Sequence, residues 1–467
     1  MHWFFGNYTE VVKGKEHIGV MLQKIYNDFP NVPFVGFLKM NTPGLLVRDP
    51  NVIKAILTTD FNSFSKNEVF SIDKKKDFLA GFNPFILDGE EWKTARGHAT
   101  PLSTTVKLKT YFPNIIDVGN VMIEYIKEQI NEGTKEIETK QLSGIYTTDV
   151  VANAFLGVSS NTFTNPNSLF ASLTKEIFTG SRIDNLKFMF GLFFPNAAPY
   201  LGLRFSSKRC EDILLSLSRK IMKERTEMGV IRNDVFQQML TYRKNDPSGM
   251  ITDEYIASHC FSFVADGYET SSDVICFTLF ELAWNYDAQE KLRVEIMETI
   301  NKTNGEYTVE VVENLKYLNQ VILESLRLHP PGLAMMKVAT QDYTLTRSDN
   351  GTSFRIKKNT PVAIPTYALQ MDPNYFENPE KFHPERFDYD DILQKRKHIY
   401  MPFGEGPRRC PGQRVGTLQV KVAILKIIEN FRLMPSAKST YPAQIDPRAI
   451  VNRPLNGAWL WFEEIKK

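Results

Sequence analysis

The chain has 467 residues, of which 42% are hydrophobic and 12% aromatic, so it can bury a large core. Its 56 lysines and arginines nearly balance 54 aspartates and glutamates, which argues against nucleic acid as the main partner. Four cysteines are too few for a disulfide framework and favour a reducing compartment over secretion. The sequence as given contains no apolar run of about 18 residues, so it predicts no transmembrane helix.

The N-terminal part of the sequence mixes strand and helix patterns. FVGFLKM and LLVRD flank the turn NTPG and predict a hairpin. Asp49-Pro50 then predicts the start of the amphipathic helix NVIKAILTTDF, because proline is favoured in a first helical turn. From about Asp88 to Leu328 helical patterns dominate, and the longest is ITDEYIASHCFSFVADGYETSSDVICFTLFELAWN.

Strand patterns return toward the C-terminus in YTLT, FRIKKNTPVAIP and GAWLWFEEI. A Pro/Phe/Arg-rich meander with little periodicity lies between about Pro373 and Cys410. No repeat, low-complexity tract or Gly/Ser linker divides the chain. We therefore expect one domain over residues 1–467, mainly α with a smaller β-rich part built from both ends of the chain, an α+β fold.

The most apolar segment is FMFGLFFPNAAPYLGLRF, Phe188 to Phe205. Two prolines and an asparagine interrupt it, so it cannot cross a bilayer as one helix. A buried connection is one interpretation. We favour a surface that dips into a membrane, because many aromatic residues cluster in a segment with loop character.

The segment FGEGPRRCPG, Phe403 to Gly412, surrounds a cysteine with glycines and two arginines. Arg408 and Arg409 predict positive surroundings that keep the Cys410 thiol ionised, and a helix pattern begins just after it. A small buried cysteine in a turn is the common alternative. It is disfavoured here because the pattern F-x-x-G-x-R-x-C-x-G is matched in full.

This segment resembles the haem-binding loop of the cytochrome P450 family, whose iron ligand is a cysteine thiolate. The resemblance implies the P450 fold, with haem b buried between a long central helix and the cysteine-bearing loop. It implies that Cys410 ligates the haem iron, that Arg408 pairs with a haem propionate, and that Phe403 packs beside the thiolate.

A second motif, ESLRLHPP, places Glu324 and Arg327 three residues apart on one helix face, where they can pair. An exposed pair of this kind would contribute little to stability. The resemblance implies a larger structural role, in which Arg386 of PERF joins them in a buried cluster that fixes the haem-binding core.

A third motif, EEWKTAR, puts Trp92 and Arg96 four residues apart, so both can face one ligand from a helix. An ordinary amphipathic helix is the alternative. The resemblance implies that both residues meet the haem propionates. Where the family usually presents an arginine to the same propionates this chain has Lys337, which lacks the bidentate fork and should bind them more weakly.

A fourth motif is FVADGYETSS, in the long helix. Gly267, Glu269, Thr270 and Ser271 match the family pattern Ala/Gly-Gly-x-Asp/Glu-Thr-Thr/Ser. The resemblance implies a proton relay through Thr270 and Glu269, with water, on the oxygen-binding side of the haem. A hydrogen bond from Thr270 to the carbonyl four residues earlier is the alternative.

Asp266 departs from this pattern, because the family has Ala or Gly at its position. It is four residues before Thr270 and therefore on the same helical face. Three interpretations stay open: a hydrogen-bonded structural acid, an additional relay or water-binding group, or a recognition site for a polar or basic substrate.

The resemblance implies a monooxygenase that inserts one oxygen atom from O2 into a lipophilic substrate, with electrons from NADPH-cytochrome P450 reductase. Lys395, Arg396, Lys397 and Arg409 could form a basic docking face for that reductase, or be ordinary solvated charges. The rival functions are a haem-thiolate isomerase or dehydratase that acts without a reductase, and a non-catalytic haem-binding protein.

Several segments, such as MDPNYFENPEKFHPERF, most resemble those of insect microsomal cytochromes P450 that oxidise xenobiotics and endogenous lipophiles. This implies the cytoplasmic face of the endoplasmic reticulum membrane. The usual N-terminal anchor and Pro-rich hinge are missing, which a truncated sequence explains better than a soluble natural form. The family layout implies these pocket-lining residues: Phe78, Phe82, Phe85, the Phe188–Leu203 region, Phe263, Leu333, Ala334, Met335 and Met336.

Overall fold

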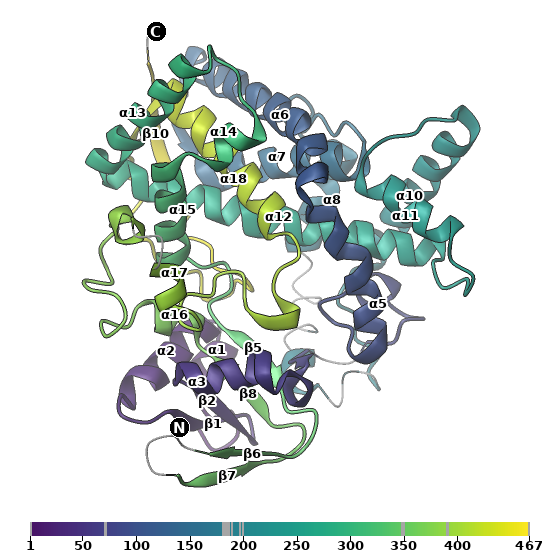
Figure 1. Cartoon of the computed structure of the whole chain (residues 1–467), viewed down its shortest axis with the longest axis vertical. Coiled ribbons are helices and arrows are strands. Elements are labelled where there is room, and N and C mark those ends of the chain that lie inside the picture. Colours follow the sequence, from purple (N-terminus) through teal and green to yellow (C-terminus); the bar gives the residue numbers. More distant parts are fainter. Residues whose placement is uncertain are drawn as a thin grey trace.

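The computed structural model places most helices in the upper part of Figure 1 and the largest sheet below them, beside the N-terminus. It describes residues 2–69, 72–179, 187, 190–195, 198, 200–346, 351–388 and 392–465. The predicted mainly α chain with a smaller β-rich part is confirmed. Among the described residues, no helix is both long and apolar enough to cross a bilayer.

The long apolar pattern forms α12, Asp253–Trp284, which has 32 residues. The Thr252 hydroxyl caps its first turn by accepting a hydrogen bond from the Tyr255 amide. Nearly all residues of its second half are buried, because other helices surround it. The helices that pack most closely on it are α4 (Phe78–Gly81), α7 (Thr139–Val151), α10 (Lys208–Met228), α15 (Lys316–Leu328) and α18 (Gln413–Asn430).

The other helices cover this core or flank the largest sheet (Figure 1). Asp49 caps α3 by accepting from two backbone amides, as the Asp-Pro signal predicts. A π-helical turn, Ala55–Thr59, follows directly. The helices that cover the core or flank the largest sheet are α1 (Thr9–Val12), α2 (Ile18–Asp28), α3 (Pro50–Lys54), α5 (Gly89–Ala99), α6 (Thr105–Asn131), α8 (Leu169–Thr179), α11 (Val235–Lys244), α13 (Tyr286–Lys302), α14 (Val309–Glu313), α16 (Thr366–Gln370) and α17 (Ile392–Lys395).

Both ends of the chain contribute to the sheets. In the five-stranded sheet the order is β1-β2-β8-β5-β3, and β2 pairs in parallel with β8 although about 315 positions separate them. A second sheet has the order β4-β10-β9, and β6 pairs with β7. The strands are β1 (Phe34–Lys39), β2 (Thr42–Val47), β3 (Lys66–Asn67), β4 (Glu136–Glu138), β5 (Met335–Val338), β6 (Tyr343–Thr346), β7 (Ser353–Ile356), β8 (Pro361–Ile364), β9 (Phe431–Pro435) and β10 (Trp459–Glu464).

The first hairpin forms as predicted, but its turn is not NTPG. The turn lies at Met40 and Asn41, and Pro43 and Gly44 belong to β2, where Gly44 pairs with Phe37. A Cβ at Gly44 would lie 2.5 Å from the Phe37 ring. The glycine is therefore required by cross-strand packing, which a local turn signal does not reveal.

Candidate functional site

Cys410 lies in a loop whose backbone depends on two glycines. Gly404 and Gly406 have φ angles of 68° and 71°, which other residues rarely adopt. A Cβ at Gly406 would lie 1.9 Å from the Leu57 carbonyl oxygen, so only glycine lets the loop pack on the π-helical turn. The Cys410 amide donates to the Phe403 carbonyl oxygen over 2.9 Å, and α18 begins shortly after.

The Cys410 side chain keeps accessible surface although protein surrounds much of it, and the accessible space beside it is called the cavity below. Burial raises the pKa of its thiol; the Gly412 amide lowers it, Asp266 adds to the rise, and Arg96 and Arg409 lower it less. Without a bound metal ion, lost hydration therefore outweighs the nearby arginines, and the predicted thiolate at Cys410 stays a prediction. Bonding to a metal ion would remove the proton outright, so this thiol suits ligation.

One face of α12 is turned toward the same cavity. Asp266 keeps an accessible side chain, yet burial raises the pKa of its carboxyl to about 7. Because Asp266 affects the pKa of Cys410, the two groups lie within electrostatic reach of each other. Thr270, one turn along the helix, donates its hydroxyl proton to the Asp266 carbonyl oxygen over 2.6 Å. The Thr270 oxygen can still accept a hydrogen bond from a molecule bound in the cavity.

Glu269 belongs to another face of α12. Its carboxylate lies 3.3 Å from Lys140 Nζ, which also contacts the Asp273 carboxylate at 2.7 Å and the Ser272 hydroxyl at 2.6 Å. Consecutive helical residues are rotated by about 100°, so Glu269 and Thr270 cannot share one face. Glu269 is therefore paired with Lys140 on α7 in this structure, and the relay through Thr270 and Glu269 stays a prediction.

Lys140 is a residue that the sequence interpretation missed. Two acids four residues apart on a buried helix, Glu269 and Asp273, do signal that a cation is needed. The cation comes from a separate helix more than a hundred positions earlier, so no spacing in the sequence identifies it.

Basic side chains gather beside the Cys410 loop. The Arg408 guanidinium lies 4.5 Å from the centroid of the Trp92 ring and donates to the Leu87 carbonyl oxygen over 2.6 Å. Arg96 donates to the Arg409 carbonyl oxygen. Trp92 itself is buried, so it supports Arg408 as a stacking surface.

Lys337 completes this basic group from β5. Its Nζ donates to the Asn67 side-chain oxygen over 2.8 Å, across the pairing of β5 with β3. Burial, and then the charge of Arg408, lowers the pKa of Lys337 to about 7. Within the described chain, none of Arg96, Arg408 and Lys337 forms an ion pair with a carboxylate. The group therefore fits an anionic ligand such as the two propionates of haem, which would restore the charge of Lys337.

Glu324 binds both arginines of the predicted cluster. Its two carboxylate oxygens accept from Arg327 over 2.8 Å each, and Arg386 donates to one of them over 2.9 Å. Arg327 is fully buried and also donates to the Pro379 carbonyl oxygen over 2.7 Å. The cluster thus attaches α15 to the meander that leads to Cys410, and all its charges have partners.

The predicted pocket residues do not all line a cavity. Phe263, Ala334 and Met335 keep part of their surface accessible, and the Met335 sulfur lies 3.5 Å from where a Cβ of Gly404 would be. The prediction that Leu333 lines the substrate pocket is wrong for this structure. Leu333 is buried against α2, where a Cβ at Gly19 would lie 2.2 Å from it, so it serves the core.

The other predicted pocket residues precede α5 or follow α8. Phe78 and Phe82 pack partly into the helical core, and the Phe82 ring lies 5.5 Å from that of Tyr255. The Phe85 side chain is 57% exposed. In the Phe188–Leu203 region, positions 188, 189, 196, 197 and 199 lie outside the described residues.

The predicted reductase-docking residues differ in exposure. Lys395, Lys397 and Arg409 are exposed. Arg396 is half-buried, and its guanidinium lies 4.2 Å from the centroid of the Phe376 ring. Arg396 therefore packs against the protein and is less available to a partner than the sequence suggests.

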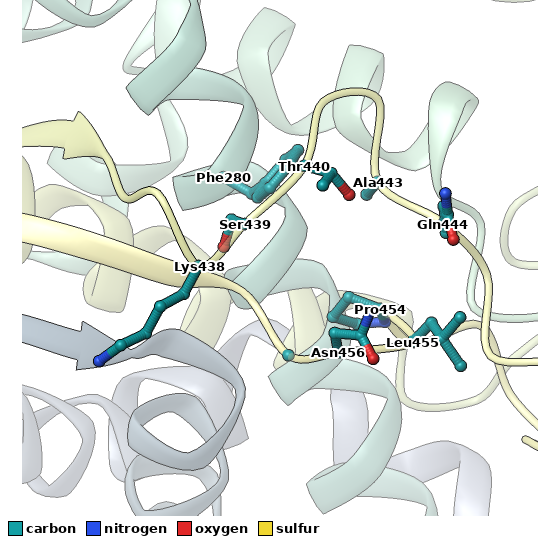
Figure 2. A pocket seen from close by; sticks show the side chains of 10 residues that line it. Phe280, Lys438, Ser439, Thr440, Ala443, Gln444, Pro454, Leu455 and Asn456 are labelled. Atoms are coloured by element: carbon teal, nitrogen blue, oxygen red, sulfur yellow. The ribbon is translucent and has the colours of Figure 1, made fainter.

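A separate cavity of about 10 Å³ lies between Phe280 of α12 and the loops at residues 438–444 and 454–457 (Figure 2). It has room for about one water molecule. Phe280 is ten residues beyond Thr270, roughly 15 Å along the helix, so this cavity is distinct from the Cys410 site.

Comparisons with known proteins agree over nearly the whole chain. Residues 1–461 match the family model described as Cytochrome P450. The chain is 32% identical over 475 residues to the probable cytochrome P450 6g2 of Drosophila melanogaster, and the matched region covers 98% of this chain and 91% of that protein. It is 33% identical over 465 residues to cytochrome P450 6B7 of Helicoverpa armigera, which covers 97% and 90%.

Replacing Gly406 by alanine should disrupt the Cys410 loop, because its Cβ would clash with the Leu57 carbonyl oxygen. Gly249→Ala is the matched control, since Gly249 has a φ of 67° but no neighbour within 4 Å. The control should lose about 1–2 kcal/mol of stability. Gly406→Ala should lose more and also bind less haem, measured by thermal unfolding and haem content. Equal losses in the two variants would contradict this account.

Replacing Glu324 by glutamine should lower the free energy of unfolding by about 3–5 kcal/mol, because two arginines would lose their buried carboxylate partner. Urea unfolding of the purified protein measures this change. Glu298→Gln, on an exposed pair with Lys302, is the control and should change stability little. A loss no larger than that of the control would show that the cluster does not hold the meander.

Proposed function

Because the chain belongs to the cytochrome P450 family and is therefore a haem-thiolate monooxygenase, we propose that Cys410 ligates the haem iron. We propose further that the enzyme inserts one oxygen atom from O2 into lipophilic small molecules, xenobiotic or endogenous. Its electrons would come from NADPH through NADPH-cytochrome P450 reductase.

The observation that carries the assignment is the placement of Cys410. Its side chain is accessible and lies within electrostatic reach of Asp266 on α12, and basic side chains that have no carboxylate partner among the described residues lie beside the same loop. A cysteine ligand and cations for two propionates are what haem b requires from a protein. The other cysteines, Cys210, Cys260 and Cys276, are buried, so a ligand in an open site cannot reach their thiols.

When bound, haem supplies oxygen activation, and the protein supplies binding, orientation and electrostatics. In this proposal Cys410 holds the iron, and Arg96, Arg408 and Lys337 hold the propionates. The Thr270 hydroxyl donates a hydrogen bond to the Asp266 carbonyl oxygen and can accept one from a water molecule in the cavity. Glu269 could take part in proton movement only after leaving Lys140.

A lipophilic substrate is supported by the side chains around the cavity. Phe263 of α12 and Ala334 and Met335 near β5 are apolar and partly accessible. Methionine and phenylalanine adapt to apolar ligands of different shapes. These contacts favour burial of an apolar substrate body.

Attachment to the endoplasmic reticulum membrane, on its cytoplasmic face, is supported by exposed apolar side chains. Trp3 is 85% exposed, and Tyr200 and Leu201 are 91% and 59% exposed. The rings of Tyr8 and Phe193 lie 5.6 Å apart, so the N-terminal segment contacts the chain near these residues. Exposed aromatic residues of this kind favour a membrane surface.

The ligand assignment is tested by the reduced-CO difference spectrum of the haem-loaded enzyme. The wild type should show the thiolate-type Soret band, and Cys410→Ser should lose it, because a serine oxygen is a poor substitute for the thiolate. Cys276→Ser is the control, since Cys276 already contacts the Thr139 hydroxyl at 3.5 Å and tolerates polarity nearby. A thiolate-type band in Cys410→Ser would refute ligation by Cys410.

Electron delivery is tested by reversing two exposed charges, in the variant Lys395→Glu/Lys397→Glu. Product formation driven by NADPH and reductase should fall, because the reductase surface that docks here must be acidic. Peroxide-driven product formation needs no reductase and should be unchanged. Equal losses in both assays would contradict docking at these lysines.

A further inference from the structure

Asp266 is a carboxylate for which the described chain provides no partner. Neither a hydrogen bond nor an ion pair involves its carboxylate oxygens there, and burial alone accounts for the raised pKa of its carboxyl. Its side chain nevertheless keeps accessible surface, on the face of α12 that carries Thr270. An acid so placed is costly to the fold unless a ligand compensates it.

Two acids that are buried in the fold, Asp77 and Asp149, are compensated by the protein itself. The Asp77 carboxylate accepts from the amides of Phe205 and Ser206 over 2.7 and 2.8 Å. Asp149 accepts from the Ser160 hydroxyl and from the Thr162 amide. Asp266 differs from both, which argues against the structural role that the sequence left open.

The protein's own cations do not serve Asp266. Arg96 and Arg409 lower the pKa of Cys410, but neither contributes to the pKa of Asp266. A positive charge at this place must therefore come from a molecule in the cavity.

We propose that Asp266 is a specificity-determining residue that selects lipophilic cations, protonated or quaternary amines with an apolar body. The inference rests on the proposed function, because the cation would be a substrate of the same site. Phe263, one turn before Asp266, offers an aromatic ring for the apolar body, and its own ring lies 5.9 Å from that of Phe155.

An organic cation fits this site better than a metal ion or a neutral polar ligand. Among the described residues no group of three or more His, Cys, Asp and Glu side chains could hold a metal ion. An ionised carboxylate only accepts hydrogen bonds. In apolar surroundings its attraction to a positive charge is stronger than in water, so a cation gains most.

The test compares two ligands of the same shape. One is the phenylbutyl trimethylammonium ion, and the other is the neutral hydrocarbon in which carbon replaces its nitrogen. Neither has a lone pair that could bind iron. Their dissociation constants for the haem-loaded enzyme are measured by calorimetry and by the spin-state difference spectrum.

Asp266→Asn should weaken binding of the ammonium ion about tenfold or more and change binding of the hydrocarbon less than about twofold. Asp266→Ala should change both dissociation constants in the same way as Asp266→Asn. It provides a second test if the asparagine variant misfolds, because a small residue is usual at this position in the family. Asp266→Glu keeps the charge and should keep the preference. Glu254→Gln, an acid at the outer end of α12, is the control and should change neither constant.

A ratio of the two dissociation constants that stays within about twofold of wild type in both Asp266→Asn and Asp266→Ala would overturn the inference. The reduced-CO spectrum is recorded on the same samples. A normal spectrum with an unchanged ratio would refute the role of Asp266 alone, whereas loss of the thiolate-type band in the wild type would refute the proposed function.

Discussion

The buried carboxylate of Glu324 is the constraint on which the haem-binding region depends. It satisfies Arg327 within α15 and Arg386 in the meander, and Arg327 also binds carbonyl oxygens of that meander. Irregular backbone cannot satisfy itself as a helix does, so it needs partners from outside. The cluster supplies them and so sets where the chain that leads to Cys410 can lie.

From that point the chain reaches the haem site through close contacts that tolerate little change. Gly406 lets the loop touch the backbone at Leu57, and α18 continues directly behind the cysteine. Opposite this loop, α12 carries two separate chemistries. Glu269 and Asp273 form ion pairs with Lys140 of α7. Asp266 and Thr270 lie on another face of α12, on the side of the cavity. The rotation between helical residues keeps these two sets apart.

Charge in the site is arranged so that bound molecules complete it. Within the part of the chain that the structure describes, Arg408 and Lys337 form no ion pair with a carboxylate, so both suit the anionic edge of haem. Burial raises the pKa of the Cys410 thiol, and haem iron bound there would take the place of its proton. Asp266 is the opposite case, because its carboxyl group has no cationic partner among the described residues and departs from the family pattern at that position.

The family, the α+β fold, the cysteine loop and the residues that can carry charge could be predicted from the sequence, because they depend on local patterns and motif spacing. Which groups meet could be seen only in the folded chain. The fold paired Glu269 with Lys140, buried Leu333 against Gly19 and raised the pKa of Cys410. The reason is physical: a pKa, a buried contact and an ion pair depend on distances between segments that are remote along the chain, and no local pattern encodes those distances.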